Sequence, residues 1–191
     1  MSDLITLGFD TSAAHCAAAL LSGEEVLTAR SEDMARGQAE RLMPLIEEML
    51  ASHAMGWTDV TRIGVGVGPG NFSGIRISVS AARGLALSLG VPAVGVTTFE
   101  AIALTALNGK TPALPAPQDQ IYFAPVGEAP RLVPSVSATD VALPPIGAQL
   151  ASNIARIAAR AAPPFARPAP VYIRPADAAP PREAPPVILD D

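Results

Sequence analysis

The pattern of apolar and polar residues divides the first half of the chain into short strands and longer helices. Five apolar runs are each long enough for one strand and are bounded by turn-forming residues. The expected strands are residues 4–9, 15–21, 26–31, 62–67 and 91–96. Because only short connections separate the first three, we expect them to form an antiparallel meander.

A helix is predicted between residues 38 and 53, where apolar residues recur at intervals of three and four. They span roughly 160° of the helix surface, wider than the ~100° stripe that a helix packed on one side needs. Two explanations are open: the helix lies deep in its own core, or one flank packs on its own sheet and the other on a partner. The apolar positions are Leu42, Met43, Leu45, Ile46, Met49 and Leu50.

A second helix, over residues 73–89, carries two different faces. Ile75, Val79 and Ala82 belong to a face typical of a core. The other face is a row at helical spacing in which three of the four residues are small, which lets the backbone of a neighbouring helix come close. Glycine costs about 1 kcal/mol against alanine inside a helix, so the glycine in this row needs a packing reason. The row consists of Ile77, Ala81, Gly84 and Ser88.

A third helix is expected at residues 99–107, after a threonine cap. The element order is then three strands, a helix, and further strands that alternate with helices. Strands separated by helices imply parallel crossovers. This order predicts an α/β fold of the actin-like (ribonuclease-H-like) type, with a mixed sheet flanked by helices.

The composition changes near residue 110. Three of the twenty prolines precede it and seventeen follow it, which predicts shorter elements and more turns in the second half. We expect an N-terminal domain at residues 1–109, a second, reduced lobe at 110–174 and a mobile tail at 175–191. Within the lobe the pattern predicts a strand at 120–126, a helix at 149–162 and a short strand at 171–173.

Charge and cysteine content narrow the possible partners. The 191 residues carry a net charge of −5, with one lysine and no basic run. We therefore do not expect the chain to bind RNA phosphates directly. Cys16 is the only cysteine, which excludes an internal disulfide and a thiolate metal cage, and its apolar neighbours favour a buried structural thiol. Neither a signal-peptide pattern nor an apolar stretch of ~20 residues occurs, so we expect a cytoplasmic protein without membrane contact.

Two segments are candidates for binding a phosphate or a nucleotide. An aspartate after the first strand orients metal and phosphate in actin-like ATPases, but it equally caps a tight turn. Residues 64–75 form a glycine-rich loop before a helix, which offers amides to an anion or allows close backbone packing at a crossover. The loop lacks the lysine of a Walker A motif. The candidate residues are Asp10, Thr11, Ser12, Gly68, Gly70 and Asn71.

Patterns for catalysis and metal binding are weak. His15 and His53 are far apart in the sequence and belong to no zinc motif. A ribonuclease-H-type nuclease needs several carboxylates around two metals, and glycines follow the fourth strand where a second acid is expected. The sequence also lacks the GxSxG motif that carries the nucleophilic serine of α/β-hydrolases. We therefore predict no catalytic residue, no metal site and no cofactor that this chain requires.

Several segments resemble the TsaB (YeaZ) family. They are GFDTS (residues 8–12), ERLMPLIEEML (40–50), GVGPGNFSGIRISVSAARGLAL (66–87), GVTTFEAIA (95–103) and PVYIR (170–174). The segment at 66–87 is the most specific. The first four matches together cover about the first 107 residues, and the fifth resembles the family's short C-terminal match. The middle of the second half matches poorly.

This resemblance implies an actin-like fold of two lobes, the second reduced, and a non-catalytic dimerisation role. The chain would pair with a catalytic TsaD-type sister in the synthesis of threonylcarbamoyladenosine in tRNA. The helices at 38–53 and 74–89 would join the sister's helices in a bundle, and the residue pattern singles out the same two helices. The interface residues would be Leu42, Met43, Ile46, Met49, Leu50, Arg76, Ile77, Ser80, Ala81, Gly84 and Ser88.

The resemblance also implies further partners. A TsaE-type ATPase joins the pair, ATP or ADP can lie near the interface, and tRNA is reached only indirectly. Alone, the chain is expected to form a homodimer, because exposed apolar helices self-associate. Two other functions remain open: an independent actin-like ATPase or phosphotransferase that uses Asp10, the glycine loop and Arg76, and a peptidase acting on a partner, for which the sequence nominates no nucleophile.

Overall fold

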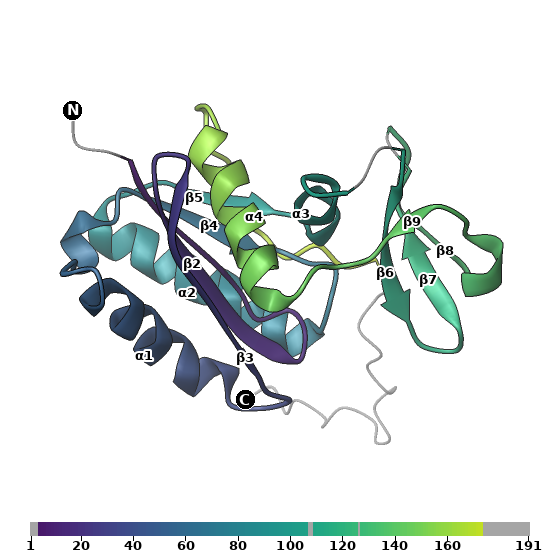
Figure 1. Ribbon diagram of the computed structural model, residues 1–191, viewed down its shortest axis with the longest axis horizontal. Coiled ribbons are helices and arrows are strands. Elements are labelled where there is room, and N and C mark those ends of the chain that lie inside the picture. The colour runs from purple at the N-terminus through teal and green to yellow at the C-terminus, as the bar shows by residue number, and fades with distance from the viewer. Residues whose placement is uncertain (1–3, 107–108, 126, 174–191) are drawn as a thin grey trace, which may run out of the picture.

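A five-stranded sheet forms the centre of the structure, a computed structural model that describes residues 4–106, 109–125 and 127–173. The strand order is β3-β2-β1-β4-β5 (Figure 1). The strands are β1 (Ile5–Asp10), β2 (His15–Ser22), β3 (Glu25–Asp33), β4 (Arg62–Gly66) and β5 (Ala93–Val96).

The pairing of these strands follows the predicted order. β1, β2 and β3 are antiparallel neighbours, with Phe9 opposite Ala18 and Ala18 opposite Arg30. β4 runs parallel to β1, and β5 runs parallel to β4. The predicted meander and parallel crossovers are therefore confirmed, and with them the actin-like (ribonuclease-H-like) α/β fold class.

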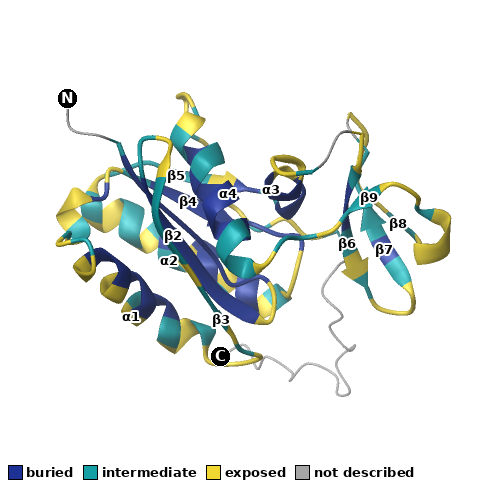
Figure 2. Cartoon of the chain, viewed as in Figure 1, coloured by how far each residue is buried: buried dark blue, intermediate teal, exposed yellow. Residues whose placement is uncertain are grey.

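Helices cover both faces of the five-stranded sheet. They are α1 (Gln38–Ala51), α2 (Phe72–Leu89), α3 (Thr98–Ala103) and α4 (Gly147–Arg160). On one face α1 packs on β2, and α2 packs on β1, β4 and β5, while α4 crosses the other face in contact with all five strands (Figure 1). The buried residues of α1 and α2 lie on the sides turned toward the sheet (Figure 2).

Alternation along the central strands gives the two faces different side chains. Phe9 of β1 and Val65 of β4 belong to the apolar core beneath α1 and α2. Gly8 and Gly64 point to the other face, where a Cβ atom at Gly8 would lie only 2.6 Å from the Cβ of Ala155 in α4. Successive residues of a strand point to opposite faces, so this valine–glycine pattern lets α4 lie unusually close to the sheet.

A smaller sheet, the reduced second lobe, follows α3 in the chain. Its strand order is β8-β7-β6-β9 (Figure 1). Few of its residues are buried, among them Ala113 and Ile121, and most residues of its strands are only partly buried (Figure 2). Its strands are β6 (Thr111–Ala116), β7 (Gln120–Phe123), β8 (Arg131–Pro134) and β9 (Val141–Ala142).

The chain comes back to the larger sheet after the small one. The predicted helix at 149–162 is confirmed as α4, but it packs on the five-stranded sheet although its residues fall in the range expected for the second lobe. Residues 163–173, here called the return segment, then run past the β5 edge. Pro168 lies beside Gly95, and the N–H of Val171 donates to the carbonyl of Val67 at 2.8 Å.

Some sequence predictions differ from the structure. The strand predicted at 171–173 is wrong, because Val171 contributes one hydrogen bond there and the segment forms no ladder. Strands β6, β8 and β9 were not expected. The division at 109/110 stays a prediction, and the tail predicted at 175–191 lies outside the described residues.

Candidate functional site

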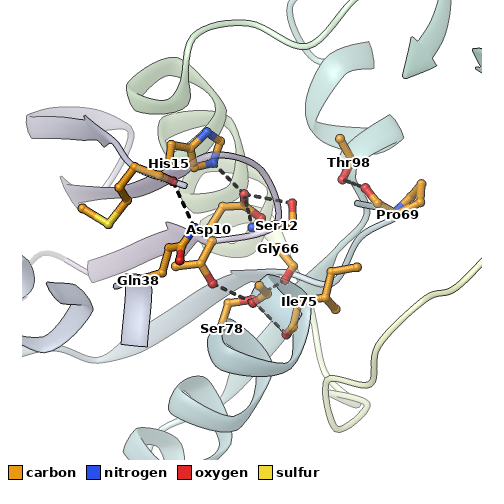
Figure 3. Close-up of polar contacts among 12 residues, drawn as sticks. Asp10, Ser12, His15, Gln38, Gly66, Pro69, Ile75, Ser78 and Thr98 are labelled. Atoms are coloured by element: carbon orange, nitrogen blue, oxygen red, sulfur yellow. Dashed lines mark hydrogen bonds and ion pairs between the residues drawn. The ribbon is translucent and has the colours of Figure 1, made fainter. Parts of the chain in front are cut away.

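A cluster of buried polar side chains closes the turn after β1 (Figure 3). Asp10 is the last residue of β1 and is only 1% exposed. Its Oδ1 accepts hydrogen bonds from the backbone N–H and from the hydroxyl of Ser12, both at 2.9 Å, and lies 2.8 Å from Nε2 of His15 (Figure 3). The carboxylate therefore has three partners within its own chain.

The other carboxylate oxygen of Asp10 faces the end of β4. A Cβ atom at Gly66 would overlap Oδ2, so glycine is required opposite the carboxylate. The Ser78 hydroxyl on α2 donates to the carbonyl of Gly66 at 3.0 Å (Figure 3). The glycine at the end of β4 thus makes room for a side chain from β1 and ties the strand to α2.

The glycine-rich loop before α2 packs on the same turn. The N–H of Asn71 donates to the carbonyl of Ser12 at 2.6 Å, and Oδ1 of Asn71 caps α2 by accepting from the N–H of Gly74 at 3.0 Å. The Thr11 hydroxyl donates to the carbonyl of Gly74 at 2.7 Å. A Cβ atom at Gly74 would overlap the Thr11 carbonyl. Two amides that could hold a phosphate are therefore already bonded within the chain.

The structure brings the predicted nucleotide-binding residues together in one place. Gly70 lies against the carbonyl of Ser12, and Gly68, with a left-handed φ of 94°, lies against Ile75 and Val171. Thr98, the first residue of α3, fixes the loop by donating its hydroxyl to the carbonyl of Pro69 at 2.9 Å (Figure 3). This geometry favours close backbone packing at the crossover, one of the two explanations open from the sequence. Nucleotide binding by these residues stays a prediction.

Sequence reasoning missed the position of His15. The residue opens β2, and because β2 runs antiparallel to β1 directly after a short turn, His15 returns to the side of Asp10. Ser12, His15 and Asp10 are thus neighbours, but the serine and the histidine both bond to the aspartate. In a hydrolytic triad the histidine lies between the other two and accepts the serine proton. The antiparallel pairing of the two predicted strands is the signal that could have located His15.

The second face of α2 is open to solvent. Arg76, Ser80, Gly84 and Ser88 are exposed, and Ile77 and Ala81 are partly buried. Apart from its own helix backbone and chain neighbours, no atom of the described residues lies within 4 Å of the Cβ position of Gly84. The predicted row therefore exists as a surface, and no described part of this chain packs against the glycine. We call these six residues the α2 face. The sequence had not pointed to Leu87 beside them, which is 86% exposed.

The structure restricts the predicted interface on α1. Leu42, Ile46, Met49 and Leu50 are buried in the core of this chain, at most 2% exposed. They face β2 and the rest of the core, because the sheet and α2 cover most of the wide apolar arc. This corrects their assignment to a partner interface. Of the five α1 residues predicted there, Met43 alone is partly exposed.

The guanidinium of Arg76 contacts two aromatic side chains, and among the described residues it has no carboxylate partner. Its guanidinium carbon lies 3.8 Å from the centroid of Phe72, and its Nε donates to the hydroxyl of Tyr172 at 3.2 Å. The two rings contact each other with centroids 4.8 Å apart. This cluster anchors the return segment to the start of α2.

Cys16 has the character of a core residue. It is fully buried in β2, and burial, helped by the nearby carboxylate of Glu32, raises the pKa of its thiol to about 11. The thiol therefore stays protonated at neutral pH. Across the described residues, no three His, Cys, Asp or Glu side chains gather in a way that could hold a metal ion. Nor does any helix in the described ranges have the length and apolar character to cross a bilayer.

Sequence comparisons relate the chain to proteins of tRNA modification. A family model described as TsaD, tRNA N6-adenosine threonylcarbamoyltransferase, matches residues 28–138, more than half of the chain. The tRNA threonylcarbamoyladenosine biosynthesis protein TsaB of Haemophilus influenzae is 33% identical over 132 residues, 66% of this chain and 55% of that protein. The TsaB protein of Escherichia coli is 32% identical over 123 residues, 62% and 53% of the two chains. The chain thus spans about half the length of the curated relatives it matches.

Solved structures show the same architecture. A Pseudomonas aeruginosa protein described as uncharacterized, with similarity to peptidase YeaZ, superposes with a TM-score of 0.71 at 25% identity, covering 90% of this chain and 100% of that one. YeaZ from Pseudomonas aeruginosa superposes with a TM-score of 0.59 at 27% identity, covering 71% and 69%.

Proposed function

Because this chain belongs to the family that the threonylcarbamoyltransferase model describes and, within it, to the TsaB/YeaZ family, we propose that it is a non-catalytic scaffold subunit. It pairs with a catalytic TsaD-type subunit in the synthesis of threonylcarbamoyladenosine in tRNA. The names of the TsaB relatives place those proteins in this pathway, and the TsaD-type subunit supplies the transfer chemistry.

The α2 face carries this proposal. Gly84 costs helix stability, and its Cβ position is open among residues 4–106, 109–125 and 127–173, so the described part of its own chain gives no reason for glycine. A helix of another subunit that packs closely on Ile77, Ser80, Ala81, Gly84 and Ser88 supplies that reason, because small residues let two helix backbones approach. We propose that Met43, a partly exposed residue of α1, adds to this contact.

The chemistry of the buried residues supports a non-catalytic role. Asp10 is bonded internally, the Ser12 hydroxyl bonds to Asp10 and not to His15, and the Cys16 thiol is buried with a raised pKa. A nucleophile needs an activating base or a lowered pKa. None of these residues meets that condition, which weakens the peptidase alternative. The ATPase alternative is weakened by the loop amides of Asn71 and Gly74, which are already bonded within the chain.

The remaining partners follow from the same proposal. A TsaE-type ATPase joins the pair, and ATP or ADP binds at the assembled interface and not to this chain alone. With a net charge of −5, the chain reaches tRNA through its partner. In the absence of that partner, two copies pair through the α2 face. We place the protein in the cytoplasm, where tRNA is modified.

Titration calorimetry with the TsaD-type protein of the same organism tests the scaffold role. We expect Gly84→Leu to weaken binding by at least about tenfold, because the new side chain separates the two helices. Gly84→Ala is the matched control for the fold, since a Cβ fits there. Wild-type affinity in Gly84→Leu would rule out the proposed interface. A normal level of threonylcarbamoyladenosine in tRNA after depletion of this chain would rule out the pathway role.

Titration calorimetry also distinguishes the scaffold role from the alternative of an independent ATPase. We expect no heat of binding when ATP and magnesium are added to the isolated chain. Binding in the micromolar range together with release of phosphate would favour the enzyme. A variant at Asp10 that keeps its fold and loses that activity would then identify the site.

A further inference from the structure

A hollow of about 400 Å³ lies beside α2 at the β5 edge of the sheet. Its floor and walls are apolar and come from three separate parts of the chain: Ala86 on α2, Pro92 before β5, and Phe165 and Pro168 of the return segment. Leu87 stands at the rim, 86% exposed. We call this hollow the β5-edge pocket.

Two arginines, Arg83 on α2 and Arg167 on the return segment, complete the lining. The Nε atom of Arg83 is buried and finds no hydrogen-bond partner among the described residues. Within the same part of the chain, no carboxylate forms an ion pair with either arginine. Arg41 and Arg160, by contrast, are paired with glutamates. Two guanidiniums without an ion-pair partner in the described ranges therefore line one apolar cavity of a chain with net charge −5.

This combination fits a carboxylate next to an apolar side chain. A guanidinium binds a carboxylate through two parallel hydrogen bonds, and a donor that is already buried without a partner gains from such a bond. The apolar walls can bury one large aliphatic or aromatic side chain, and the cavity volume suits a few residues of peptide. RNA fits less well, because a phosphate backbone needs a basic track longer than two residues.

The pocket is continuous with the α2 face. Arg83 precedes Gly84 in the sequence, and Leu87 lies one turn further along α2. We infer that the β5-edge pocket receives an acidic, apolar peptide segment of the same subunit that packs on the α2 face, with its carboxylate on Arg83 and Arg167. This inference rests on the proposed function, because it assigns the segment to the TsaD-type partner.

Binding of the full chain to the TsaD-type protein at low and high salt tests the charge contacts. We expect the double variant Arg83→Gln/Arg167→Gln to bind about tenfold more weakly than wild type at low salt and to lose most of the salt dependence. Arg167→Gln alone, at an exposed residue that the fold does not need, should show a smaller loss in the same direction. Arg131→Gln, at an exposed arginine of β8 outside the pocket, is the control and should bind as wild type.

The outcomes separate this inference from the proposed function. If Gly84→Leu loses binding while the arginine variants bind as wild type, the pocket assignment is overturned and the scaffold role stands. If Arg131→Gln weakens binding as much as the double variant, general charge and not the pocket is responsible, and the assignment is again overturned. If Gly84→Leu binds as wild type, the scaffold interface itself has failed.

Photo-crosslinking identifies the occupant directly. Benzoylphenylalanine in place of Leu87 should crosslink to a TsaD-type peptide that contains Asp or Glu beside an apolar residue. The same group at Val136, an equally exposed position in the small lobe, should give no such product. A product within this chain, at residues 174–191 whose sequence also joins acidic and apolar residues, would overturn the assignment, and so would a crosslink to added tRNA.

Discussion

The Nε2 atom of His15 lies 2.8 Å from Oδ1 of Asp10, inside the turn that joins the first two strands. Both residues are buried, and the same oxygen also binds Ser12. The carboxylate thus bonds to its own chain, so we expect substitution of Asp10 to act first on the stability of the fold.

We expect Asp10→Ala to lower the free energy of unfolding by about 3 kcal/mol or more. The change leaves the N–H and hydroxyl of Ser12 and the ring of His15 without their acceptor, and each unsatisfied buried group costs about 1–3 kcal/mol. Urea denaturation measures the loss. Asp33→Ala, at the exposed end of β3, is the control and should change little. A stable Asp10→Ala protein would mean that the cluster does not support the turn.

Ile46→Ala tests whether α1 belongs to the core or to the interface. Ile46 is 0% exposed, so we expect a loss of about 2–5 kcal/mol in unfolding free energy, through lost burial and the cavity left behind. Met43→Ala, on the partly exposed side of the same helix, should lose less stability but weaken binding to the TsaD-type protein. If Ile46→Ala keeps wild-type stability and fails only in binding, the placement of α1 is wrong.

Arg62 holds the C-terminal end of α4. Its Nη1 donates to the carbonyls of Ala158, Ala159 and Ala161 at 2.9, 2.7 and 3.0 Å. A charged donor on the free carbonyls of a helix end is stabilising, so Arg62→Met should lower the unfolding free energy by about 2 kcal/mol.

The control for Arg62 is an arginine that meets a glutamate at the surface. Arg160 pairs with Glu24 at 2.6 Å, and both side chains are largely exposed. Exposed ion pairs contribute little, so Arg160→Met should change stability much less than Arg62→Met. Chemical denaturation of the two variants decides the point, and equal losses would contradict the role given to Arg62.

The Cys16 thiol makes stability depend on alkaline pH. Burial raises its pKa from 9.0 to about 11, so the folded chain holds this proton more tightly than the unfolded chain. The associated stability is complete below pH 9 and is lost as the pH rises toward 11. Between about pH 8 and about pH 10, wild type should lose about 1 kcal/mol more than Cys16→Ala. Parallel curves for the two proteins would show that Cys16 does not titrate in this way.

The sequence predicted the larger sheet well and the small one poorly. Residues 15–21 and 62–67 have local patterns that fit β2 and β4 almost residue for residue. β6 contains Pro112 and Pro115, and proline cannot donate to a ladder, so a proline-rich segment does not suggest a strand. β8 and β9 are short and little buried, so their sequences show no clear alternation of apolar and polar residues.

The candidate site was predicted in its parts but not in its geometry. Helical spacing alone predicted the row on α2 that consists of Ile77, Ala81, Gly84 and Ser88. Residues three and four positions apart lie on the same side of a helix whatever the rest of the fold does. The side of α1 that packs against the core could not be predicted in this way. Its apolar arc is wide enough for two surfaces, and only the position of the sheet shows that the arc is buried.

The chain's sequence by itself determined the elements of the first half, their order and the row of mostly small residues on α2. These depend on neighbours along the chain, whose spacing and turn chemistry are local. The tertiary structure decided what distant segments do together. It brought α4 onto the larger sheet through Gly8 and Gly64, closed Asp10 against Gly66, and set Phe165 and Arg167 beside Arg83. Such contacts join residues far apart in the chain, so their distances follow from the packing of whole elements and not from any local pattern.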